Sequence, residues 1–138
     1  MNIIISSENV FKKVCSEVFY RGEVKRGENV DVAAIAQMSE DDKAVFNDLF
    51  EDAAGDALEE LMIWHNPNLS IDGDAKFEVC PPASWPMMVE ELTKAIEVFM
   101  VHKIVNRWMY MLGIGAEDFT KSDALKIRML LTKREKPL

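Results

Sequence analysis

The stretch that decides the fold is residues 84–113, SWPMMVEELTKAIEVFMVHKIVNRWMYMLG. Ser84 is a good N-cap residue, and Pro86 falls in the first turn, where its missing N–H costs nothing. Gly113 follows the last apolar residue and can adopt the left-handed conformation that ends many helices. These signals predict one long helix over 84–113, about 40 Å in length at 1.5 Å per residue.

The apolar residues of this helix change sides along its length. On a helical projection the apolar residues of the first half centre on one side, and those of the second half centre on the opposite side. The two sets are Met88, Val89, Leu92, Ala95, Ile96 and Phe99, and then Val101, Ile104, Val105, Trp108 and Leu112. Two interpretations remain open. Either different elements of the chain cover the two ends, or one apolar face meets another subunit.

The N-terminal third is expected to hold one helix and one loop. Residues 1–6 predict a short extended lead, and a helix follows to about Tyr20, because Gly22 is a stop signal. Residues 21–38 begin with a charged run that contains two glycines, which predicts a flexible or irregular loop. This loop would carry a small basic cluster of Arg21, Lys25 and Arg26.

The remaining segments predict two helices and a hairpin. A capping pattern at Ser39 starts a helix that extends to about Trp64, and an Asp-Gly pair within 69–79 predicts a β-hairpin. A last helix is expected from 116 or 117 to 134 or 135. The 138 residues therefore predict a single, mainly α domain over 1–138. It is a helical bundle of about four helices with a long central helix and a small β-hairpin.

Charge is spread unevenly along the chain. The formal net charge of −8 argues against a nucleic-acid partner. Residues 39–60 hold nine acidic side chains and one lysine, whereas 119–138 hold six basic and two acidic side chains. Such a dipole can close inside one chain, helix on helix, or it can steer one subunit onto the next.

No catalytic signature is recognisable. There is no phosphate-binding glycine loop, nucleophile elbow or Cys/His metal cluster, so we expect no enzyme activity, no cofactor and no metal. His65 and His102 fall in different elements and are expected at a helix end or an interface rather than as ligands. Cys15 and Cys80 make no disulfide framework, which predicts free thiols in a reducing, cytoplasmic setting. The longest apolar segment is interrupted by charged residues, so we expect no membrane span.

Two segments carry a family resemblance: residues 98–110 (VFMVHKIVNRWMY) and 126–137 (KIRMLLTKREKP). They resemble a group of small helical proteins that are encoded among the capsid and tail genes of tailed phages and prophages of Bacteroides-type bacteria. The bundle with its long central helix is also similar to head–tail adaptor proteins. The resemblance implies a structural role in virion assembly, as a head–tail connector or completion protein. Its setting would be the cytoplasm of the bacterial host, or the virion.

The expected partners are other copies of the chain or other virion proteins. We predict contact through the second half of the central helix and the last helix. The residues expected at this interface are Lys103, Arg107, Trp108, Tyr110, Arg128 and Arg134. The alternative is a regulatory or antitoxin-like helical module that binds one protein partner.

Overall fold

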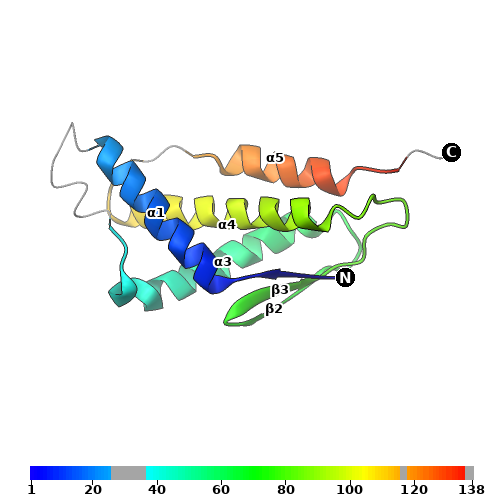
Figure 1. Ribbon diagram of the computed structural model, residues 1–138, viewed down its shortest axis with the longest axis horizontal. Helices are drawn as coiled ribbons and strands as arrows, with labels where there is room; N and C mark the ends of the chain where they lie inside the picture. Colours follow the sequence, from blue (N-terminus) through cyan, green and yellow to red (C-terminus); the bar gives the residue numbers. More distant parts are fainter. Residues whose placement is uncertain (26–36, 116–117, 136–138) are drawn as a thin grey trace.

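The computed structural model (Figure 1) describes residues 1–25, 37–115 and 118–135. Its elements in chain order are β1 (Asn2–Ile5), α1 (Ser7–Lys25), η1 (Glu40–Asp42), α3 (Lys43–Leu61), β2 (Asn68–Asp72), β3 (Asp74–Glu78), α4 (Val89–Met111) and α5 (Thr120–Leu131). The described residues are mainly helical, with a small antiparallel sheet, which confirms the predicted fold class.

Helix α4 is the centre of the bundle. In Figure 1, α1 crosses in front of α4, α5 runs above it, and α3 lies below and behind it. Most apolar residues of both halves of α4 are buried, including Leu92, Phe99, Ile104 and Trp108. Different helices of the same chain therefore cover the two ends of α4. The exchange of apolar sides along the helix no longer calls for a second subunit.

The predicted start of the central helix was wrong. Helix α4 begins at Val89, five residues after Ser84. Trp85 is only 1% exposed, and its indole N–H donates to the carbonyl of Leu130 at 2.9 Å. Met87 takes a left-handed backbone conformation with φ 53°. Burial of the Trp85 ring thus outweighs the capping signal at Ser84 and keeps this segment out of the helix.

The predicted end of α4 is confirmed. Gly113 has φ 73°, a conformation that glycine adopts without steric cost. The Gly113 N–H donates to the carbonyl of Tyr110, and the Ile114 N–H donates to that of Met109, each at 2.9 Å. This pair of bonds is the Schellman motif, which satisfies carbonyls that a helix end would otherwise leave open.

Helix α1 is longer than predicted, because it continues through Gly22 to Lys25. Arg21 and Gly22 are both buried, and the Arg21 guanidinium bonds to Asn106 of α4. This contact with α4 stabilises the last turns of α1 despite the glycine. Arg21 therefore does not belong to an exposed basic cluster. Residues 26–36 of the predicted loop, Arg26 among them, lie outside the described residues.

The sheet has the predicted hairpin and one more strand. Strands β2 and β3 pair antiparallel around Gly73, which has φ 72°. Strand β1 pairs with the other edge of β3, in the order β1-β3-β2. The extended lead at 1–6 was thus recognised, but its pairing was not. Its Ile3 and Ile5 side chains are buried in the core.

Helix α5 is shorter than predicted at both ends, since it runs over Thr120–Leu131. At its C-terminus, the indole N–H groups of Trp64 and Trp85 donate to the carbonyls of Leu131 and Leu130. The two indole rings meet edge to face at a centroid distance of 4.8 Å. The tryptophans therefore cap the last turn of α5 and join it to the chain after α3 and before α4.

Two further expectations concern the thiols and the membrane. Cys15 and Cys80 are both free, which confirms the prediction for these residues. Within the described ranges, no helix combines the length and the apolar character needed to cross a membrane.

Candidate interface groove

An open groove of about 940 Å³ lies between α3 and the C-terminal half of α4, and we call it the α3–α4 groove. Its walls include Glu51, Asp52, Gly55 and Asp56 of α3, and Lys103, Arg107 and Tyr110 of α4. The groove is also lined by Ile114, Gly115, Asp118 and Thr120.

Small residues of α3 leave room for this groove. Ala53 and Ala57 are buried against the rest of the bundle, and Gly55 lies between them on the groove lining. A Cβ atom placed on Gly55 would meet no atom within 4 Å. The groove floor at Gly55 is therefore open, and a larger side chain at this position would extend into the groove.

The groove is more acidic than basic. Five acidic side chains (Glu51, Asp52, Asp56, Glu59 and Asp118) line it, against Lys103 and Arg107. The Lys103 ammonium lies 3.8 Å from the Asp56 carboxylate, and both side chains are partly exposed to solvent, so the pair contributes little to stability. Glu51, Asp52 and Glu59 are exposed on the α3 side. Their negative charge makes this wall attractive to a basic partner.

An exposed aromatic residue stands beside the basic side of the groove. Tyr110 is 74% exposed, and the Arg107 guanidinium lies 5.7 Å from the centre of its ring. Tyrosine and arginine are the residue types that most often dominate binding energy at protein interfaces. This corner of the groove therefore has the composition of a docking surface.

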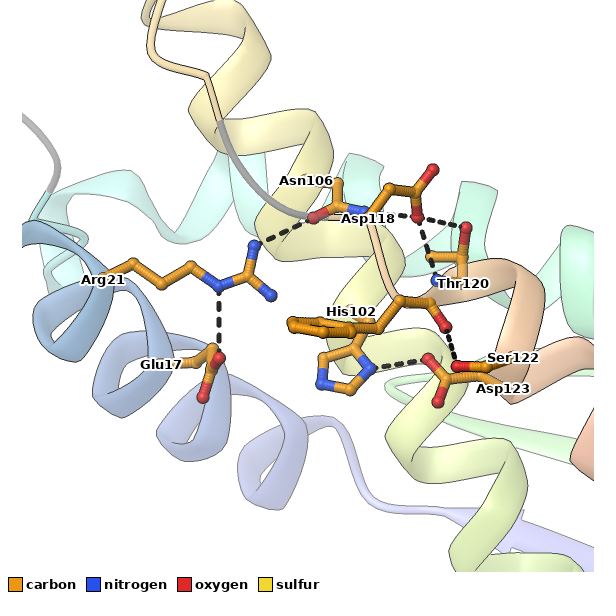
Figure 2. Close-up of polar contacts among 9 residues, drawn as sticks. Glu17, Arg21, His102, Asn106, Asp118, Thr120, Ser122 and Asp123 are labelled. Atoms are coloured by element: carbon orange, nitrogen blue, oxygen red, sulfur yellow. Dashed lines mark hydrogen bonds and ion pairs between the residues drawn. The ribbon is translucent and has the colours of Figure 1, made fainter. Parts of the chain in front are cut away.

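A chain of polar contacts fixes the end of the groove (Figure 2). The Asn106 carbonyl accepts from Arg21 of α1 at 3.0 Å, and the Asn106 amide donates to Asp118 at 2.9 Å. The same Asp118 oxygen accepts from the backbone N–H and the hydroxyl of Thr120 at the start of α5. These contacts link α1, α4 and the start of α5 at the end of the groove.

Asp118 has a lowered pKa. The hydroxyl of Thr120 is the largest cause, followed by the Thr120 backbone N–H, because both bonds favour the charged carboxylate. A carboxyl whose folded pKa lies below its unfolded pKa stabilises the fold above the unfolded value, about pH 4. That contribution is lost as the pH falls through the folded pKa.

We therefore expect Thr120→Val to raise the pKa of Asp118 toward its ordinary value, because the isosteric side chain keeps the shape and loses the hydroxyl donor. Carboxyl NMR titration of the parent and the variant measures this shift. Ser122→Ala is the matched control, since the Ser122 hydroxyl donates to the Phe119 carbonyl instead. An unchanged Asp118 pKa in Thr120→Val would contradict the assignment of the hydroxyl as the main cause.

The two histidines are placed differently from one another. The Nδ1 atom of His102 donates to the Asp123 carboxylate at 2.6 Å (Figure 2). The His102 ring also contacts that of Phe119. His102 therefore joins the middle of α4 to α5 inside the chain. His65 lies after α3 and contacts Asn66. In the part of the chain that the structure describes, no group of three potential ligands could hold a metal ion.

The structure separates the six residues expected at an interface. Lys103, Arg107 and Tyr110 come together in the α3–α4 groove. Trp108 is only 7% exposed and packs in the core, so it offers a partner almost no surface. The remaining two residues lie outside the groove and contact their own chain.

Both of these arginines contact other residues of their own chain. Arg128 forms a two-pronged ion pair with Glu60 of α3, at 2.7 and 3.2 Å. Arg134 folds back onto the carbonyls of Leu131 and Lys133. The Arg128–Glu60 pair links the acidic helix to the basic end of the chain, so part of the predicted charge dipole closes internally.

Sequence reasoning missed the α3 wall of the groove. Nothing in the spacing of the acidic residues of α3 pointed to Lys103 or Arg107 as neighbours. Gly55, in the middle of a strong helical pattern, was the available signal, because an interior helical glycine often marks a packing or binding requirement.

Comparisons with protein-family models, with curated proteins and with solved structures found no match.

Proposed function

We propose that this chain is a non-enzymatic structural protein of a tailed phage or prophage. In this proposal it is a head–tail connector or completion component that self-associates or docks onto a virion ring, and the α3–α4 groove is its docking surface. The observation that carries the docking role is the meeting of Lys103, Arg107 and Tyr110 along one open groove. The phage setting is supported by the resemblance of residues 98–110, which form much of the α4 wall.

The composition of the groove supports binding rather than catalysis. Its side chains form an exposed aromatic and arginine corner with a charged rim, the arrangement that protein interfaces favour. The fold around it is rigidly tied by the Asn106 contacts to α1 and α5. A docking surface on packed helices loses little conformational entropy when a partner binds.

The proposal is tested by filling the groove without touching the core. Gly55→Gln places a bulky uncharged side chain on the open groove floor, and Gly55→Ala is the matched control, because it adds only a methyl group. Each variant replaces the chromosomal gene in the host that carries it, and tailed particles are counted by electron microscopy. We expect Gly55→Ala to yield as many tailed particles as the parent. Gly55→Gln should reduce the number of tailed particles by a factor of roughly ten or more.

Circular dichroism must first show that both variants fold like the parent. A folded Gly55→Gln variant that assembles normal numbers of tailed particles would contradict the groove as the docking surface. Deletion of the gene with no effect on particles would contradict the virion role. Portal, capsid and tail genes are expected beside this gene.

A further inference from the structure

The outer face of α5 is an exposed surface with both apolar and basic residues. Helix α5 packs on the bundle through Ile127, Leu130 and Leu131. On the side away from the bundle, Leu125 and Met129 are 57% and 59% exposed, and they lie one helical turn apart. Lys121 and Lys126 are exposed around them. We define the outer face of α5 by these four residues: Lys121, Leu125, Lys126 and Met129.

The outer face of α5 and the α3 wall of the groove carry opposite charges, whereas Lys103 and Arg107 lie on the α4 wall. The groove presents exposed acidic side chains, among them Glu51 and Asp52, together with the ring of Tyr110. The outer face presents two lysines around Leu125 and Met129. Opposite charges would pair at the rim, and the apolar side chains would cover the tyrosine ring.

One copy cannot bring these two surfaces together. In Figure 1, α5 runs above α4, and α3 lies below and behind it. The bond between Arg128 and Glu60 holds α5 in this position against α3. The outer face of α5 lies opposite Ile127, Leu130 and Leu131, which pack on the bundle, so it points away from α3 and α4 and meets such a groove only on a second molecule.

We propose that the occupant of the α3–α4 groove is the outer face of α5 of a second copy of this chain. This inference rests on the proposed function, because it names the partner of the same groove. The contact joins two different surfaces, so each added copy leaves one groove and one outer face unused. Such a head-to-tail contact continues into a ring or a filament, unlike a two-fold contact, which stops at a dimer.

The experiment blocks one surface at a time. Lys121→Glu with Lys126→Glu reverses the charge of the outer face, and Glu51→Lys with Asp52→Lys reverses that of the groove; all four positions are exposed. Lys12→Glu with Lys94→Glu is the matched control for the outer-face variant, with the same charge change at exposed positions on α1 and α4. Sedimentation velocity at low salt measures the size distribution of each protein and of their mixtures, after circular dichroism has confirmed folding.

We expect the parent and the control to form species larger than dimers. The association of each blocked variant should be weaker by a factor of roughly ten or more. In a mixture of the two blocked variants, the native groove of one variant can bind the native outer face of the other. The two reversed surfaces can also meet. The native pair should form in the mixture. A chain that carries all four reversals should regain association, because the charges are exchanged and remain complementary. Association of the parent should weaken above a few hundred millimolar salt, because the Debye length shortens and the exposed charges are then screened from one another.

The outcomes separate this inference from the proposed function. A parent that remains monomeric at high concentration, while Gly55→Gln still abolishes particle assembly, overturns the second copy as occupant and leaves the virion role in place. Blocked variants that associate like the parent also overturn it, because the contact then lies elsewhere. If Gly55→Gln both associates and assembles particles normally, the groove is not a docking surface and both proposals fail.

Discussion

Trp85→Ala is expected to lower the free energy of unfolding by about 4 kcal/mol, the usual range for removing a large buried aromatic side chain. The Trp85 ring is 1% exposed and meets the Trp64 ring edge to face. Its loss would leave a cavity between the ends of α3, α4 and α5. It would also remove the indole donor to the Leu130 carbonyl. Urea unfolding followed by circular dichroism measures the change.

Two control variants separate the contributions. Trp85→Phe keeps an aromatic ring and loses the indole donor, so we expect a loss of about 1–2 kcal/mol. Tyr110→Ala removes an aromatic side chain that is largely exposed and should change stability by about 0.5 kcal/mol or less. A Trp85→Ala loss no larger than that of Tyr110→Ala would contradict the role of Trp85 as the anchor of the α5 terminus.

The same tryptophan explains why the start of the central helix could not be predicted from local signals. Ser84 and Pro86 form a good capping pattern, but local capping contributes only about 1 kcal/mol. Burial of the Trp85 ring contributes more, and it depends on Trp64 and Leu130, which are distant in sequence. The end at Gly113 was predictable, because the Schellman motif uses only neighbouring residues.

Non-local contacts account for the other differences in the fold. The Asp72-Gly73 turn is local, so the hairpin followed from the sequence. The pairing of β1 with β3 joins Ile3 to Phe77 across most of the chain, and no local pattern encodes it. The continuation of α1 through Gly22 likewise depends on a contact with α4, which outweighs a helix cost of about 1 kcal/mol for glycine.

The candidate site was predictable on one side only. Lys103, Arg107 and Tyr110 follow one another at helical spacing, so their common face on α4 could be deduced from the sequence. Which helix lies opposite them depends on the packing of the bundle, and α3 supplies the acidic wall. Arg128, like Arg107, is an exposed cation. Only its tertiary partner, Glu60, shows that it holds its own chain together.

Arg21→Ala is expected to lower the free energy of unfolding by about 3 kcal/mol. Arg21 is 8% exposed, and its guanidinium bonds to Glu17 and Asn106 (Figure 2). The guanidinium also lies over the Phe119 ring. Truncation would remove this packing and leave the buried side of Asn106 without its charged donor. Lys13→Ala is the matched control on the same helix, because Lys13 is exposed and pairs with Glu97 at the surface. It should cost about 1 kcal/mol or less.

A double-mutant cycle with Asn106→Ala shows how much of this loss comes from the contact between α1 and α4. Asn106 accepts from Arg21 and donates to Asp118, so either single substitution disrupts the same polar chain. The combined loss should be smaller than the sum of the single losses by about 1 kcal/mol or more, as expected for residues in one network. Strict additivity would contradict this coupling. In that case Arg21 would stabilise α1 through its own helix and through Phe119, and the end of the groove would be held by Asp118 and Thr120 alone.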